Sequence, residues 1–127
     1  MKIPQLQLMR KGGKILWLQG TEDASVSPFA NARYYESIVA NMGQEEVDTF
    51  IRFYMVPRLA HGGGNFSPTW DNLNILDNWV ENGVAPPAMP IANRTGGRTW
   101  PLRLHPAWPK YIGGDPKVAA SFTCVNE

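Results

Sequence analysis

The chain has 127 residues, of which 43% are hydrophobic and 18% charged, and its formal net charge is +1. This size and composition fit one globular domain and exclude a disordered chain. A near-neutral charge without a basic run offers no electrostatic footprint to nucleic acid or to an anionic membrane surface, and no apolar run approaches the roughly 20 residues of a membrane-spanning helix.

The first half of the chain alternates strand and helix patterns. An apolar run at residues 14–18 follows two glycines and predicts a parallel strand buried on both faces. Ser27 and Pro28 supply a cap and a first-turn proline for a helix over residues 29–42, which Gly43 ends. The apolar positions that recur on one face of this helix are Ala32, Tyr35, Val39 and Met42.

A second strand and helix follow a polar link at residues 44–46. Residues 49–56 are rich in aromatic and β-branched side chains and predict a strand that Pro57 ends. Ser67 and Pro68 repeat the cap-and-proline signal before a helix over residues 69–81, which Gly83 ends. The expected buried face of this helix consists of Trp70, Leu73, Leu76 and Val80.

The alternation predicts the α/β class, with a parallel sheet. We expect residues 1–83 to form a strand-helix-strand-helix piece, and residues 84–127, which hold seven of the eleven prolines, an irregular wrapping tail of the same domain. A short edge strand is expected near Ile91 and Ala92. Two strands do not make a stable sheet, so further strands must come from the tail, from a partner chain or from sequence outside this chain.

Asp23 and His61 are the candidate catalytic residues. Asp23 lies in a polar loop after the first strand, and His61 lies in a glycine-rich loop after the second. Ligands of doubly wound sheets bind beyond the carboxyl ends of the strands, which is where both loops lie. An acid that orients a histidine, and a histidine that accepts a proton, are two parts of a hydrolase triad. The alternative for each residue is an ordinary hydrogen-bonded loop position.

The glycines after His61 have two interpretations. A His-Gly-Gly-Gly motif builds the oxyanion hole of some lipases and esterases, but there it precedes the nucleophile. Here the motif follows the acid loop, so we favour a role in giving the His61 loop backbone freedom.

The chain offers no recognisable nucleophile. None of its five serines lies in a Gly-x-Ser-x-Gly motif, and Ser27 and Ser67 are better explained as helix caps. Two histidines and one cysteine show no ligand spacing, so we expect neither a metal nor a cofactor. Cys124 is the single cysteine, which excludes a disulfide within the chain. Trp17, Trp70 and Trp79 fall within apolar patterns, which favours core packing over sugar binding.

Several stretches resemble the C-terminal part of the tannase/feruloyl esterase family of α/β-hydrolases. The matching segments are residues 12–16, 20–28, 33–36, 53–57, 61–63, 76–86, 98–102, 113–116 and 119–124. The resemblance implies a serine esterase that acts on phenolic or aromatic carboxylic esters such as feruloyl or galloyl esters. It assigns Asp23 as the triad acid and His61 as the base, and it places the nucleophilic serine and a lid domain upstream of this chain.

The sequence departs from this family in two places. Gly62 stands where the family has a cysteine bridged to one beside the serine. Arg103, Leu104 and His105 stand near the position of another family cysteine, which leaves Cys124 without its expected partner. The resemblance also implies a secreted or periplasmic protein, although residues 1–5 lack the features of a signal peptide.

Two functional hypotheses follow. The first is the acid-base segment of an aromatic-ester hydrolase, inactive alone and dependent on an upstream hydrolase core or a second chain for its serine. The second is a non-catalytic α/β module that self-associates or binds a partner through an unfinished sheet edge.

Overall fold

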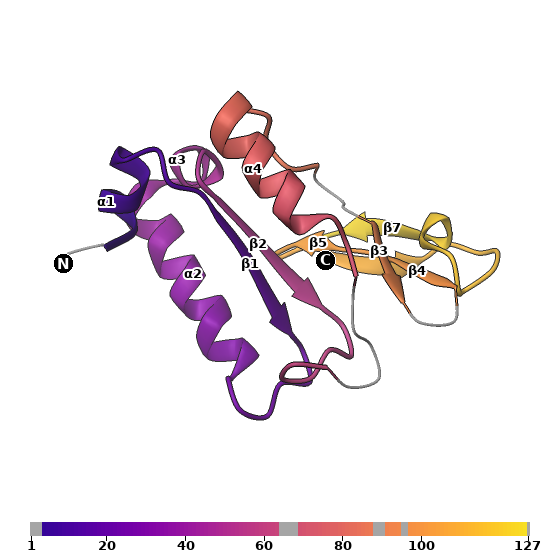
Figure 1. Cartoon of the computed structure of the whole chain (residues 1–127). Coiled ribbons are helices and arrows are strands. Elements are labelled where there is room, and N and C mark those ends of the chain that lie inside the picture. Colours follow the sequence, from indigo (N-terminus) through magenta and orange to yellow (C-terminus); the bar gives the residue numbers. More distant parts are fainter. Residues whose placement is uncertain (1–3, 64–68, 88–90, 95–96, 127) are drawn as a thin grey trace.

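The computed structural model describes residues 4–63, 69–87, 91–94 and 97–126. In chain order the elements are α1 (Pro4–Arg10), β1 (Ile15–Gly20), α2 (Pro28–Met42), α3 (Gln44–Asp48), β2 (Ile51–Val56), α4 (Asn72–Asn82), β3 (Ile91–Arg94), β4 (Arg98–Pro101), β5 (Arg103–Leu104), β6 (Trp108–Tyr111), the 3₁₀ turn η1 (Ala119–Ser121) and β7 (Phe122–Val125). Figure 1 shows α2 and α4 on opposite sides of the β1–β2 pair, with the later strands gathered at one end of the molecule.

The main sheet has the strand order β1-β2-β5. β1 and β2 are parallel and in register from Ile15 opposite Ile51 to Gly20 opposite Val56. β5 pairs antiparallel with the other edge of β2. Because the carboxyl ends of parallel strands meet at one edge of a sheet, the loops that follow β1 and β2 are neighbours.

The helix α2 covers one face of this sheet, as its apolar spacing predicts. Trp17 and Phe53 lie on this face with ring centroids 4.4 Å apart, and Tyr35 of α2 packs against Phe53 at 5.0 Å. The helix begins at the predicted cap, where the hydroxyl of Ser27 accepts a hydrogen bond from the backbone N–H of Ala30 at 3.2 Å. This aromatic cluster fixes α2, and with it the far end of the loop that carries Asp23.

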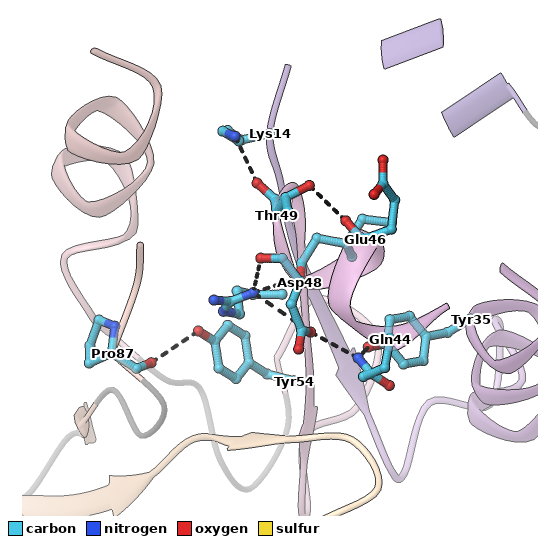
Figure 2. A network of polar contacts seen from close by, with 10 residues as sticks. Lys14, Tyr35, Gln44, Glu46, Asp48, Thr49, Tyr54 and Pro87 are labelled. Carbon is cyan, nitrogen blue, oxygen red and sulfur yellow. Dashed lines mark hydrogen bonds and ion pairs between the residues drawn. The ribbon is translucent and has the colours of Figure 1, made fainter. Parts of the chain in front are cut away.

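The helix α4 covers the opposite face through Trp79, which is 3% exposed. Lys14 Nζ and Arg52 Cζ lie 5.2 Å and 5.1 Å from the centroid of the Trp79 ring. Both cations are held by backbone carbonyls. Lys14 donates to that of Thr49 at 2.7 Å (Figure 2), and Arg52 donates to that of Asp48. Each such cation–π contact contributes about 0.5–1 kcal/mol or more, so Trp79 anchors α4 to the sheet.

The buried face of α4 differs from the one that the sequence predicts. Leu73 is 77% exposed and Val80 is 47% exposed, whereas Trp79, expected in the core but not on this face of the helix, is buried. The large ring of Trp79 packs against the sheet and contacts two cations, and Leu73 and Val80 face solvent. The helix begins at Asn72, and the predicted cap Ser67 lies outside the described residues.

The expectation of an irregular tail over residues 84–127 is not met, because this segment contains five strands. The expected edge strand is β3, which pairs antiparallel with β4, and β6 pairs antiparallel with β7. Pro101 and Pro109 lie in these two-stranded ribbons, where an edge tolerates a residue without an N–H. The strand β5 supplies a third member of the main sheet.

Two short helices also differ from the sequence expectations. The polar link at residues 44–46 is part of α3, and α1 precedes the first strand. Both are shorter than eight residues, too short to show a helical period. Across the residues that the structure describes, no helix combines the length and the apolar character needed to cross a membrane.

Candidate active site

The carboxylate of Asp23 is held by its own loop. Its Oδ1 atom accepts hydrogen bonds from the backbone N–H groups of Ser25 at 2.9 Å and Val26 at 2.8 Å. Aspartate is suited to this turn because its short side chain reaches the backbone two and three residues further on. The side chain is 9% exposed, and its second oxygen, Oδ2, points away from the turn toward the next loop.

That second oxygen meets His61. The distance between Asp23 Oδ2 and His61 Nδ1 is 3.0 Å, so two residues 38 positions apart in the sequence are in direct contact. A carboxylate only accepts, so Nδ1 carries the proton in this pair. The imidazole is 62% exposed, and within the described residues its Nε2 atom has no hydrogen-bond partner. An oriented imidazole with an outward Nε2 is suited to accept a proton from a nucleophile.

The surroundings keep Asp23 ionised. The N–H of Val26 has the largest effect and lowers the pKa of Asp23 below its usual value. Partial burial of the carboxyl acts in the opposite direction, and the bonds from His61 and Ser25 lower the pKa of Asp23 further. At neutral pH the carboxylate is therefore available to stabilise an imidazolium on His61.

The two loops are joined along their backbones. Thr21 N–H donates to the carbonyl of Val56 at 3.0 Å, and Glu22 N–H donates to the carbonyl of Leu59 at 3.1 Å. A Cβ atom at Gly20 would lie 2.1 Å from the carbonyl oxygen of Leu59, so this approach requires a glycine. The acid loop and the histidine loop thus form one unit at the edge of the sheet.

The His61 loop turns back on itself. Ala60 N–H donates to the carbonyl of Gly63 at 2.8 Å, which places His61 and Gly62 at the tip of a tight turn. Gly62 has φ +70°, in the left-handed region that favours glycine. This geometry agrees with a conformational role for Gly62. Gly64 lies outside the described residues, and the oxyanion interpretation stays untested.

The other candidate groups lie elsewhere. Ser27 is engaged as the cap of α2, Ser67 lies outside the described residues, and Cys124 is an exposed free thiol on β7. No group of three or more His, Cys, Asp or Glu side chains that could hold a metal ion occurs in the described segments.

A second histidine-carboxylate pair was not predicted from the sequence. His105 Nε2 lies 2.9 Å from Glu36 Oε1, and the His105 ring packs against Tyr35 and Phe53 at centroid distances of 6.0 Å and 5.5 Å. No sequence pattern relates the two residues, which are 69 positions apart. The pair fastens the tail to α2, with the His105 ring against the aromatic cluster and the Glu36 carboxylate exposed.

Comparisons with known proteins place the chain in a family. A profile of the family described as tannase and feruloyl esterase matches residues 6–125. An esterase of Agrobacterium fabrum is 56% identical over 123 residues, which are 92% of this chain and 22% of that protein. A probable feruloyl esterase of Arthroderma benhamiae is 31% identical over 134 residues, covering 98% of this chain and 25% of that protein.

Solved structures of esterases are similar to this chain as well. The crystal structure of feruloyl esterase B from Aspergillus oryzae matches 94% of this chain and 28% of its own with a TM-score of 0.83 and 25% sequence identity. The chain therefore spans about a quarter of the length of these relatives. The α/β fold that the sequence predicts is the fold of the corresponding part of feruloyl esterases. From the profile match over nearly its whole length, the chain belongs to the tannase and feruloyl esterase family.

Proposed function

We propose that Asp23 and His61 are the acid and the base of a serine esterase that hydrolyses aromatic carboxylic esters of the feruloyl or galloyl type. The observation that carries this proposal is the 3.0 Å contact between Asp23 Oδ2 and His61 Nδ1 at the carboxyl ends of two parallel strands. The membership of the chain in an esterase family supports it.

The chemistry assigns one step to each group. The Oγ atom of a serine attacks the ester carbonyl while His61 Nε2 takes the hydroxyl proton, and Asp23 stabilises the imidazolium without being protonated. His61 returns the proton to the departing alcohol, which leaves an acyl-enzyme. Water then attacks the acyl group with His61 again as base. This step releases the carboxylic acid and regenerates the serine hydroxyl.

The serine in this proposal comes from outside the chain. No serine here lies in a nucleophile elbow, and the chain spans about a quarter of its relatives. An upstream hydrolase core, or a second chain equivalent to it, would supply the serine and most of the pocket that selects the ester. On family membership alone we propose a secreted or periplasmic location.

A chimera tests the assignment. Residues 6–125 replace the matching part of the Agrobacterium fabrum esterase, and turnover of feruloyl and galloyl esters is measured. Asp23→Asn should lower kcat by about 10⁴-fold, because the amide favours the wrong imidazole tautomer. The matched control is Glu36→Gln in the second pair, which should keep turnover within a few fold. An active chimera that tolerates Asp23→Asn would refute the role of the acid.

A second candidate function, association through a sheet edge, is supported by a different observation. Among the described strands β1 is an edge of the main sheet, with a six-residue row of backbone groups on its outer side. Next to this sheet, α4 exposes Leu73 and Val80. These features favour a module that pairs with itself or with a partner strand and has no catalytic role.

Sedimentation and an ester assay separate the two functions. The second predicts an oligomer that Leu73→Glu with Val80→Lys dissociates, and a chimera without turnover. A monomeric chain together with a chimera that loses activity on Asp23→Asn would exclude it.

A further inference from the structure

A buried glutamine lies beneath the acid loop. Gln19 is the penultimate residue of β1 and is 4% exposed. Its Nε2 atom donates hydrogen bonds to the carbonyls of Gly20 at 3.0 Å and Val26 at 3.2 Å. Its Oε1 atom accepts a bond from the side-chain amide of Asn31 in the first turn of α2. Gln19 thus contacts the last residue before the loop, a residue near the end of the loop and the helix that follows it.

The contact with Val26 links Gln19 to the catalytic acid candidate. The N–H of Val26 donates to Asp23 Oδ1, and its carbonyl accepts from Gln19. Gln19 therefore holds Val26, the residue whose N–H has the largest effect on the pKa of Asp23. Because Asp23 is bound on one oxygen by Val26, the position of Val26 also sets the direction of the other oxygen, which reaches His61.

Burial makes this arrangement sensitive to substitution. An apolar side chain of similar size at position 19 would leave the Val26 carbonyl and the Asn31 amide without their partner, and an unpaired buried polar group is costly. The loop would then move to hydrate the Val26 carbonyl. A shift of a few tenths of an ångström is enough to lengthen the bond between Asp23 and His61.

We infer that Gln19, anchored by Asn31, is a positioning residue that aims the Asp23 carboxylate at His61. It touches neither substrate nor the reacting atoms and acts through the backbone of Val26, whose carbonyl it binds and whose N–H binds Asp23. This inference rests on the proposed function, because it concerns the same acid-base pair.

The tautomer of His61 reports the contact without any need for turnover. A neutral histidine whose Nδ1–H donates to a carboxylate is held in the Nδ1–H tautomer. Two-dimensional ¹H–¹⁵N correlation through the ring protons measures this tautomer directly on the 127-residue chain with the ring neutral. His105 is an internal reference of opposite kind, because its Nε2 atom meets Glu36.

Three variants and one control define the test. Asp23→Asn gives the signal of His61 without its carboxylate. Gln19→Leu should lose the Nδ1–H preference to the same extent, and Gln19→Glu, which keeps an acceptor for Asn31 but no donor for Val26, should do the same. Met55→Ala is the matched control, since Met55 lies opposite Gln19 in the sheet and its thioether has no donor for the carbonyl of Val26. It should leave His61 unchanged.

The outcomes distinguish the role of Gln19 from that of the Asp23–His61 pair. If Asp23→Asn shifts the His61 tautomer and Gln19→Leu and Gln19→Glu do not, Gln19 is only a structural residue and the inference fails while the proposed function stands. If Asp23→Asn itself changes nothing, the acid-base pair fails first. An equal shift in Met55→Ala would show a general loosening of the sheet and would also overturn the role of Gln19.

Discussion

The two histidines of this chain both meet a carboxylate, yet their exposure is reversed. In the Asp23–His61 pair the acid is 9% exposed and the imidazole 62%, whereas in the Glu36–His105 pair the acid is 58% exposed and the imidazole 16%. A base must reach a substrate, so burial of the acid with exposure of the histidine suits catalysis. Burial of the histidine among aromatic rings, with the acid in solvent, suits a fastening between tail and helix.

The ring nitrogens differ as well. His61 uses Nδ1 for its carboxylate and leaves Nε2 outward, while His105 uses Nε2 for Glu36 and packs against Tyr35 and Phe53. Residue type and carboxylate distance are nearly identical in the two pairs, so they do not distinguish them. Burial and the choice of nitrogen do.

The largest expected difference between the pairs is in activity. In the chimera described above, His61→Ala should reduce kcat by about 10⁴-fold or more, because the base is lost. His105→Ala should change kcat by only a few fold at a temperature where the protein stays folded. Steady-state kinetics with a feruloyl ester measures both. Comparable losses in the two variants would remove the distinction.

The next largest effect is expected in β5, where a substitution of Arg103 should change the free energy of unfolding. Arg103 is fully buried, and none of its guanidinium nitrogens has a hydrogen-bond partner among the described residues. Replacing even a buried ion pair with apolar side chains of similar volume is often neutral or stabilising by about 1–4 kcal/mol, and a buried charge without a partner lacks the compensating attraction. Arg103→Met should therefore raise the free energy of unfolding, measured by urea titration. A loss of more than about 2 kcal/mol would mean that the guanidinium has an anionic partner.

The two histidine substitutions should have the opposite ranking when the free energy of unfolding is measured in place of activity. His105→Ala removes a ring packed against Tyr35 and Phe53 and should lower the free energy of unfolding by about 1–3 kcal/mol. His61→Ala removes an exposed side chain and should cost no more than about 0.5 kcal/mol. Thermal and urea unfolding of both variants provide the measurement, and an equal cost would contradict the structural role of His105.

The smallest effects are in the pH dependence of stability. The pKa of Asp23 is lowered in the folded chain, so its contribution is present above the ordinary aspartate pKa and is lost as pH falls through the lowered value. Burial raises the pKa of Tyr54 to about 12, so its contribution is present below the ordinary tyrosine pKa of 10.0 and is lost as pH rises toward about 12.

Two substitutions separate these limbs. Asp23→Asn should flatten the acid limb of the stability profile and Tyr54→Phe the alkaline limb, each without changing the other. The phenol of Tyr54 donates to the carbonyl of Pro87 at 3.4 Å, a long bond whose loss should be small (Figure 2). Urea unfolding between about pH 3 and pH 11 gives both profiles.

Local signals predicted the positions of the first elements well. The apolar runs gave β1 and β2 within about two residues, and Ser27 with Pro28 marked the start of α2. The proximity of Asp23 and His61 followed from their places after two parallel strands and is found at 3.0 Å, while their catalytic role stays a prediction. These inferences succeed because strands, caps and loop ends depend on neighbouring residues.

Other features required contacts between distant segments. The buried face of α4 was predicted wrongly because Trp79 is drawn by Lys14 and Arg52, which lie on other elements. Apart from β3, the strands of the tail were missed, because they are short and rich in proline and their pairing depends on partners elsewhere in the chain. Gln19 gave no signal, since a single polar residue at the end of an apolar strand has several ordinary explanations.

The sequence by itself determined the α/β order of elements, the loops that carry Asp23 and His61, and the family, because each depends on local pattern or on residues in series. Only the tertiary structure decided which histidine is exposed, which ring nitrogen each one uses, and that Gln19 and Val26 lie behind the acid. Burial and hydrogen-bond direction are properties of packed neighbours, and those neighbours come from strands, helices and tail segments far apart in the chain.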